Sequence, residues 1–321
     1  MGRSRHRNKR KIPFKPPARK TVQVSVACPG GSRPGIDPRI IVQLQKLDQL
    51  VGAMRVNIGV PNGAWDEESA IERYLAYLSM LTDVALTDMV ISAIHNNDLA
   101  VIMKQRMLVE YSAKGRYYNI HRDRALHLMT IDEARSVLEK VKKSDPESPH
   151  IAALEADYNE KKANFAAVID AGPQSMLKIM QELAVDPLHP DSVTDGEYYF
   201  IYAAPSALMH GEPEGIRFIF DRDEEGNEKP KIRVSDEELN AMLVDAGRNT
   251  LFFCDTFIDC FHENDSTLRQ YLKELSTNFN VLLLRHPHGR SDDVLETLRQ
   301  ELTAEGIDFE KYPLPLANVQ G

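Results

Sequence analysis

Residues 66–94 read DEESAIERYLAYLSMLTDVALTDMVISAI, and this stretch indicates the fold more clearly than any other. Apolar residues recur in it every three or four positions, which is the spacing that gathers side chains on one face of an α-helix. Asp66 is the expected N-cap of this helix. Its expected inner face consists of Ile71, Leu75, Leu78, Leu81, Val84 and Ala85, with further apolar turns through Val90 and Ile94.

The same helical spacing extends along most of the chain. It predicts helices over residues 41–54 and 97–118, with Gly115 as a candidate break in the second. The sequence TIDE at 130–133 is a capping box, in which a hydroxyl and a carboxylate satisfy the exposed amides of a helix start. A further helix is expected to begin at Ser148. The fold class predicted from these segments is mainly α, a helical bundle.

A change of period after residue 215 predicts a small β-hairpin. The sequences IRFIF and KIRV flank a ten-residue polar connection, so we expect the hairpin over residues 216–234. A second capping box, SDEE at 235–238, then predicts a long buried helix through 239–261. We assign residues 37–265 to one helical bundle domain.

The C-terminal residues 266–321 are expected to form a small α/β appendage. In this region NVLLLRH, at 280–286, is typical of a buried strand. The sequence SDDVLETLRQELTAEG, at 291–306, predicts a helix that stops at its glycine.

Composition favours a soluble protein of the cytoplasm. The chain has 321 residues, of which 42% are hydrophobic and 27% are charged. Its three cysteines form no CxxC pair, so neither a disulfide framework nor a cysteine zinc site is indicated. No run of apolar residues approaches the roughly 18 that a membrane span requires. The short segment VQVSVAC near the N-terminus is too polar for a signal peptide, and we expect no membrane partner.

Residues 1–36 form a basic arm with ten Lys or Arg residues and no acid. Because the whole chain carries a net charge of −9, the remainder carries −19. The arm is rich in proline and poor in apolar residues, so we expect it to be disordered. It is either a solvated tail or a contact for RNA or DNA. The nucleic-acid contacts would come first from Arg3, Arg5, Arg7, Lys9, Arg10 and Lys11.

A candidate site is indicated by YYFIYAAPSALMHGEPEG, residues 198–215. Tyr202, Ser206 and His210 follow one another at intervals of four, so on a helix they span only about 80° of one face. In QRMLVEY, Arg106 and Glu110 have the same spacing among apolar neighbours. A buried Arg–Glu pair is costly unless further groups satisfy it. We therefore expect these five side chains to form one polar cluster between two packed helices.

The two motifs QRMLVEYSAKGRYY and YFIYAAPSALMHG together resemble a bacterial group of helical proteins, the domain of unknown function 5677. That group pairs an Arg-x3-Glu helix with a Ser-x3-His helix, and the resemblance covers residues 80–261. It implies an α-helical fold and Arg106, Glu110, Ser206 and His210 as site positions. It implies no established activity.

Three other patterns in the sequence are weaker indications of a site. RDRALH, at 122–127, matches the Arg-polar-x3-His pattern of HEPN-type ribonucleases, but so short a pattern arises easily by chance, and a solvated charged turn is the expected role. His286 and His288 in RHPHGR are possible metal ligands, but a loop is the expected role. DRDEEGNE, at 221–228, lacks the ligand pattern of an EF-hand and is expected to be a hairpin tip.

Two function classes remain open from the sequence. The first is a nucleic-acid-directed protein, an RNase-like defence or toxin component, in which Arg106 binds phosphate while His210 and Tyr202 serve as acid and base. In a variant of this reading Ser206 is a nucleophile, but the chain has no G-x-S-x-G elbow. The second class is a non-catalytic helical sensor or protein-interaction module. The sequence indicates no cofactor, substrate or oligomeric state.

Overall fold

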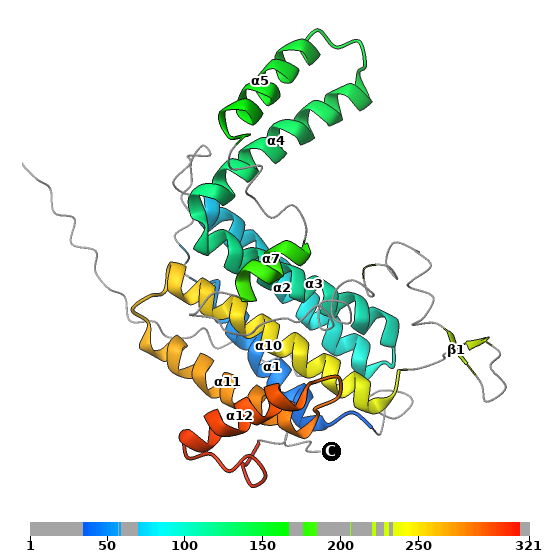
Figure 1. Ribbon diagram of the computed structural model, residues 1–321, viewed down its shortest axis with the longest axis vertical. Helices are drawn as coiled ribbons and strands as arrows, with labels where there is room; N and C mark the ends of the chain where they lie inside the picture. The colour runs from blue at the N-terminus through cyan, green and yellow to red at the C-terminus, as the bar shows by residue number, and fades with distance from the viewer. Residues whose placement is uncertain are drawn as a thin grey trace, which may run out of the picture. The chain divides into compact units, whose positions relative to one another are not determined.

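The computed structural model describes residues 35–56, 58, 70–166, 176–184, 206, 220–222, 228–230 and 234–314, and these are mainly helical (Figure 1). The predicted basic arm lies outside the described residues apart from its last two positions. In chain order the helices are α1 (Pro38–Met54), α2 (Ala70–Ile94), α3 (Asp98–Ile120), α4 (Arg122–Ser144), α5 (Ile151–Asn164), α7 (Met176–Ala184), α10 (Asp236–Phe261), α11 (Ser266–Arg285) and α12 (Asp292–Ala304).

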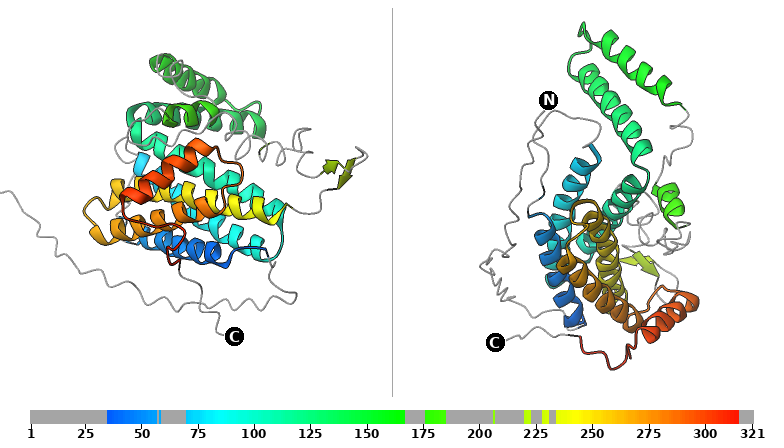
Figure 2. Two further views of the ribbon diagram at one scale, coloured as in Figure 1. Left: turned by 60° about the horizontal axis from the view of Figure 1, so that its bottom comes forward. Right: turned by 90° about the vertical axis from the view of Figure 1, so that its left-hand side faces the viewer.

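One hydrophobic core joins most of these helices. The central helix α3 packs most extensively against α10 and α2, and α1 packs against α2, α10 and α11. Figure 2 shows α1, α10 and α11 side by side. The largest buried side chains of this core include Leu44, Leu75, Phe253, Phe257 and Phe279. A smaller cluster forms where α7 covers α3, around Tyr117 and Met180.

Helix starts follow the expected capping chemistry in two places. Asp37 caps α1 by accepting a hydrogen bond from the backbone N–H of Arg39, and Pro38 occupies the first helical position. Ser235 and Glu238 form the predicted capping box of α10, in which each side chain accepts from the other residue's backbone N–H. The long helix predicted after SDEE is confirmed.

Two glycines inside helices allow aromatic rings to pack against the backbone. A Cβ atom at Gly115 would overlap the ring of Phe253, and one at Gly247 would overlap the ring of Phe279. Glycine is unfavourable in a helix interior by about 1 kcal/mol relative to alanine, so these close contacts explain its presence. The expected break at Gly115 is wrong, because α3 continues through it.

Two other local predictions are wrong. Thr130 lies in the middle of α4, where its hydroxyl donates to the carbonyl of Leu126 at 2.9 Å instead of capping a helix start. The segment NVLLLRH is the last turns of α11, with Val281–Leu284 buried in the main core. Four adjacent apolar residues fit a fully buried helix as well as a buried strand. Residues 266–285 and 292–304 are therefore helical, and the α/β character expected for the appendage is not found in the described residues.

The outer face of α2 also differs from the prediction. Val84 is 58% exposed and Leu81 is only partly buried, whereas the inner face uses Ala85, Leu86 and Met89. By length and composition α2 is apolar enough to cross a membrane, and 39% of its most apolar window is buried in the protein. The sequence reading missed this because Asp83 and Asp88 interrupt the apolar run. A core helix of a soluble protein meets the same criteria.

Within the predicted hairpin, two short strands are described. β1 (Phe220–Arg222) pairs antiparallel with β2 (Glu228–Pro230), and Phe220 lies opposite Pro230. The sequences IRFIF and KIRV lie mostly outside the described residues, so a hairpin over the whole of 216–234 stays a prediction.

The helices α4 and α5 form a helical hairpin (Figure 1). The helix predicted from Ser148 is α5, which begins at Ile151. None of the residues of α5 is buried. Lys142 of α4 and Glu155 of α5 form an exposed ion pair between the two helices.

Candidate functional site

The central helix α3 is unusually polar for its position. It contacts α2, α10, α7 and α4, yet it buries Asp98, Gln105, Ser112 and Arg116 among its apolar residues. Natural sequences usually place apolar residues at such positions, and departures from this rule concentrate at functional sites. The polar residues of α3 therefore form the candidate site that the described residues support, and we call the face that carries Arg106, Glu110 and Lys114 the polar side of α3.

A ladder of three charged residues runs along α3. Arg106 Nη2 lies 3.0 Å from Glu110 Oε2, and Lys114 Nζ contacts the other carboxylate oxygen, Oε1. The spacing of four residues places all three side chains on one face. Arg106 and Glu110 are 14% and 17% exposed, so their ion pair is screened less than one on the surface. One carboxylate thus holds two cations in place.

Tyr74 of α2 and Tyr111 of α3 lie close enough to Glu110 for its charge to affect them, and other tyrosines pack around Tyr74. The ring centroids of Tyr74 and Tyr118 are 5.0 Å apart, and Tyr77 lies 6.5 Å from Tyr74. Burial raises the pKa of Tyr74 well above its usual value, and the charge of Glu110 adds to this effect. The pKa of Tyr111 is raised by the same two causes. These phenols therefore stay protonated near neutral pH and can donate hydrogen bonds, whereas none is suited to act as a base.

A second polar group lies between α4, α7 and the C-terminal end of α3. Arg124 Nη1 of α4 lies 3.4 Å from Glu182 Oε2 of α7. Burial raises the pKa of Tyr117, and the negative charge of Glu182 raises it further. Of these three residues, only Tyr117 belongs to α3.

The predicted cluster is described only in part. Arg106 and Glu110 form the expected ion pair. Ser206 is helical and partly exposed, whereas Tyr202 and His210 lie outside the described residues, as does the proline-containing segment around Ser206. Contact between the two motifs stays a prediction. Sequence reasoning missed Lys114 and Tyr74, although the continuation of the four-residue spacing to Lys114 was a usable signal.

The arginine and histidine of RDRALH have separate partners. Arg122 donates to Glu72 and, at 2.9 Å, to Asn119 Oδ1. The ring of His127 stacks on Phe165 with centroids 3.8 Å apart. The two residues are five positions apart in α4, which turns them about 140° away from each other. Arg122 and His127 therefore do not form the shared site that the HEPN-like pattern requires.

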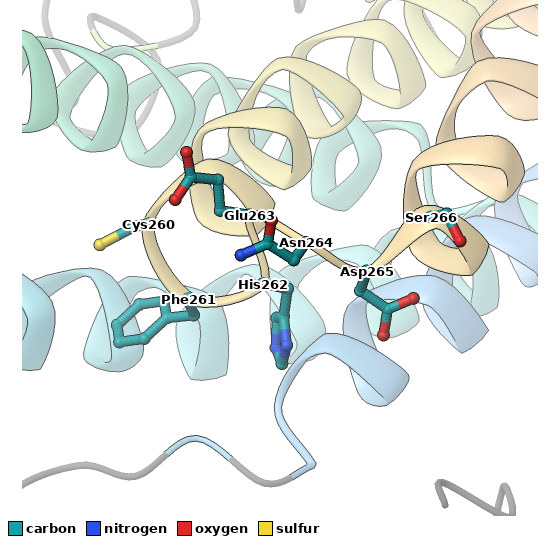
Figure 3. Close-up of a pocket in the computed structure, with 7 residues that line it drawn as sticks. All are labelled: Cys260, Phe261, His262, Glu263, Asn264, Asp265 and Ser266. Atoms are coloured by element: carbon teal, nitrogen blue, oxygen red, sulfur yellow. The ribbon is translucent and has the colours of Figure 1, made fainter. Parts of the chain in front are cut away.

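A pocket of about 530 Å³ lies at the turn between α10 and α11 (Figure 3). Its lining is the continuous segment Cys260–Ser266. His262 points toward the end of α1, where its Nε2 lies 2.8 Å from the carbonyl oxygen of Met54. Burial raises the pKa of the Cys260 thiol, although nearby Arg122 partly offsets this. A protonated thiol and a histidine bound to backbone favour a structural role for this turn.

A second pocket, of about 480 Å³, lies between the start of α1 and the C-terminal segment. Arg285 lines it and donates to the carbonyl oxygens of Phe309 and Tyr312, at 2.8 and 2.9 Å. Asp37 and Arg39 line its other side, and they pair with each other. The polar groups of this pocket are thus already bound to one another.

The histidines of RHPHGR each lie near carboxylates. His286 Nε2 is 3.0 Å from Asp37 Oδ2, and His288 lies 3.6 Å from Glu237 and 3.9 Å from Glu238. The sequence alone did not indicate these carboxylates, because they come from distant positions. Among the described residues, no group of three or more His, Cys, Asp or Glu side chains is arranged to hold a metal ion.

No family model, curated protein or solved structure matches this chain. The resemblance to the domain of unknown function 5677 group therefore stays a prediction. The candidate site rests on its own geometry.

Proposed function

We propose that the chain is a nucleic-acid-directed protein, an RNase-like component, whose site is the polar side of α3 together with Tyr202, Ser206 and His210. The observation that carries the proposal is the charge of the central helix. From Asp98 to Ile120 it has four Lys or Arg residues and two acids, whereas the chain beyond residue 36 carries −19. A net positive helix in an acidic protein favours a phosphate-bearing ligand.

The residues have complementary roles in this proposal. Glu110 orients Arg106, whose guanidinium binds a phosphate of the substrate. His210 accepts the proton of the attacking hydroxyl, and Tyr202 donates a proton to the leaving oxygen. Tyr74 and Tyr111 stay protonated and supply hydrogen bonds near Glu110. Their spacing of four residues, which on a helix would put Ser206 and His210 on one face, supports their inclusion.

The basic arm gathers the substrate in this proposal. Its Lys and Arg residues release counterions on meeting phosphates, which provides affinity without sequence specificity. Cys254 and Cys260 are both free thiols, which fits the reducing cytoplasm in which we propose that the protein acts.

Binding and cleavage of labelled single-stranded RNA test the proposal, with single-stranded DNA compared in parallel. Four proteins are needed: the full chain, a chain lacking residues 2–36, Arg106→Gln and His210→Gln. Arg135→Gln is the matched control, because Arg135 is exposed on α4 and pairs with Asp132 at 2.9 Å. We expect arm deletion to weaken binding and flatten its salt dependence, and Arg106→Gln and His210→Gln to abolish cleavage.

The proposal is wrong if the full chain neither binds nor cleaves either nucleic acid. Thermal melts of each variant separate loss of activity from loss of fold. If Arg106→Gln lowers the melting temperature while His210→Gln binds and cleaves like the Arg135→Gln control, the cluster is structural.

A second candidate function is a non-catalytic helical sensor or protein-interaction module. One observation favours it: both carboxylate oxygens of Glu110 are already engaged, one by Arg106 and one by Lys114. A satisfied network of this kind stabilises a unique packing without requiring a ligand. This candidate predicts that Arg106→Gln changes stability and leaves nucleic-acid binding by the arm intact.

A further inference from the structure

The outward face of α2 is apolar where an amphipathic helix should be polar. Tyr77, Met80, Val84 and Ile91 are 54%, 54%, 58% and 47% exposed. Thr87 is exposed between them, and none of these five positions carries a charged residue, although Asp83 and Asp88 lie at neighbouring positions. A run of exposed apolar residues on one helix face usually marks an interaction surface.

The spacing of these residues is that of a coiled-coil seam. Steps of three and four alternate through Tyr77, Met80, Val84, Thr87 and Ile91, and the next step reaches the partly buried Ile94. This is the a and d pattern of a heptad repeat, which fits the side of another helix. We call these six positions the α2 seam. It is about 27 Å long at the helical rise of 1.5 Å per residue.

The carboxylates beside the α2 seam each have a polar partner. Asp83 pairs with Arg55, which follows α1, and Asp88 Oδ2 lies 2.7 Å from Lys104 Nζ of α3. Asp48 Oδ1 accepts a hydrogen bond from the hydroxyl of Thr87 at 2.9 Å. These carboxylates remain charged, so they constrain how a second helix can lie on the seam.

The two aspartates distinguish the possible orientations of a second α2 helix. With Tyr77 at position a and Met80 at position d, Asp83 is at position g and Asp88 at position e. In a parallel pair, a g position faces the e position of the next heptad in the other helix, so Asp83 of each copy would face Asp88 of the other. Like charges in this position are unfavourable. In an antiparallel pair, Asp83 instead faces Val90 and Asp88 faces Leu81.

The antiparallel register also matches side chains by size. Layers of an antiparallel coiled coil join an a position to a d position of the other helix. The α2 seam then gives Tyr77 against Ile94, Met80 against Ile91 and Val84 against Thr87, each layer occurring twice around a two-fold axis. The seam is thus complementary to a second copy of itself.

We propose that the α2 seam is a homodimer interface, in which α2 helices of two copies of this chain pack antiparallel. This inference is independent of the proposed function. The seam covers fewer than three heptads, and such a contact falls at the low end of specific interfaces, below about 1,200 Å² in total. The dimer is therefore weak and its population depends on protein concentration.

Sedimentation velocity of the full chain over a wide range of concentration tests the proposal. We expect the wild-type chain to change from monomer to dimer as the concentration rises. Val84→Glu, at the centre of the seam, should remain monomeric because it places a charge in the contact of both copies. Val137→Glu is the matched control: Val137 is 41% exposed on α4, so it adds the same charge away from the seam and should dimerise like wild type.

Cysteine cross-linking tests the orientation. Met80→Cys and Ile91→Cys share a layer in the antiparallel pair, so a mixture of the two variants should form a mixed disulfide under mild oxidation. Met80→Cys alone should not cross-link to itself through residue 80, because the two copies of that residue lie about 16 Å apart along the axis. The wild-type chain, oxidised in the same way, controls for the native cysteines.

Several outcomes overturn the proposal. A wild-type chain that stays monomeric at every concentration has no such interface, and a dimer that survives Val84→Glu uses another surface. Circular dichroism shows whether Val84→Glu is folded, and Val84→Ser replaces it if not. Self-cross-linking of Met80→Cys alone would show a parallel pair. If the wild-type chain stays monomeric and sediments with lipid vesicles while Val84→Glu does not, the seam is a membrane-binding surface instead.

Discussion

His286 Nε2 lies 3.0 Å from Asp37 Oδ2, which joins the residue after α11 to the N-cap of α1. Arg39 donates to the same carboxylate through Nε and through its backbone N–H, both at 2.9 Å. Burial by itself raises the pKa of Asp37, but the hydrogen bonds from His286 and Arg39 outweigh burial and hold this pKa well below its usual range. One ionised carboxylate therefore caps α1 and ties its start to the end of α11.

Acid should weaken this connection. Because the pKa of Asp37 is lower in the folded state, its stabilisation is complete above the unfolded value of about 4 and is lost as the pH falls through the folded value. We expect Asp37→Asn to lower the free energy of unfolding at neutral pH by about 1–2 kcal/mol, after allowance for solvent screening. Its stability should also fall less than that of wild type below about pH 4.

Urea unfolding at a series of pH values measures the effect of Asp37→Asn. Asp308→Asn is the control, because Asp308 is an exposed carboxylate that pairs with Lys311. Parallel stability profiles for wild type and Asp37→Asn would contradict the role assigned to the Asp37 carboxylate.

Glu110→Gln should destabilise the fold more than an equivalent surface change. The substitution leaves Arg106 and Lys114 without their shared carboxylate on a largely buried face of α3. We expect a loss of about 1–3 kcal/mol in the free energy of unfolding, less than for a fully buried pair. Asp157→Asn removes an exposed pair of the same spacing, with Lys161, and should cost under about 0.5 kcal/mol. If both variants lose the same free energy of unfolding, the charged residues on α3 contribute no more to stability than an exposed ion pair.

Gly247→Ala should destabilise the junction of α10 and α11. The added methyl group overlaps the Phe279 ring, and overpacking of a core costs about 1–3 kcal/mol. A smaller residue at position 279 makes room for the methyl group, so Gly247→Ala should cost less in a Phe279→Leu background. A double-mutant cycle measured by chemical denaturation gives the coupling. Strict additivity of the two substitutions would rule out the contact as the cause.

Alkaline titration should separate the buried tyrosines from the rest. Burial raises the pKa of Tyr74, with Tyr118 and Glu110 adding to the effect, so this phenol stays neutral in the folded state above the usual titration range. The stabilisation is complete below the unfolded value of about 10 and is lost as the pH rises beyond it. Absorbance at the phenolate band should show that some tyrosines ionise only at the pH where the protein unfolds. The number of these late-ionising tyrosines should be smaller in Tyr74→Phe. An unchanged late fraction in Tyr74→Phe would place the effect on other tyrosines.

The helices that begin with a strong local signal were predicted well. Ser235 and Glu238 satisfy each other within four residues, so the start of α10 needs no tertiary information. TIDE at 130–133 has the same letters of a capping box but lies inside α4, where packing of Ile131 and Ala134 keeps the helix continuous. The apolar run at 281–284 shows the same limit, since burial on all sides removes the periodicity that separates helix from strand.

The candidate site shows what sequence spacing alone can predict. The Arg106–Glu110 ion pair follows from local helix geometry, and the structure shows it. Tyr74 comes from another helix, α2, so its proximity to Glu110 depends on how α2 and α3 pack. Val84 was placed on the wrong face because Leu81 and Val84 are apolar, and hydrophobicity alone does not tell a core residue from an exposed one.

The hairpin of α4 and α5 has a consequence for the cooperativity of unfolding. Because α5 buries none of its residues, its opening exposes little apolar surface and costs far less than unfolding of the core. Its amide hydrogens should exchange with solvent through local opening, on a timescale separate from those of α3 and α10. A proteolytic nick at residues 145–150 should likewise leave the helices of the main core folded. The chain thus contains one segment whose order can be lost and regained while the central helices stay intact.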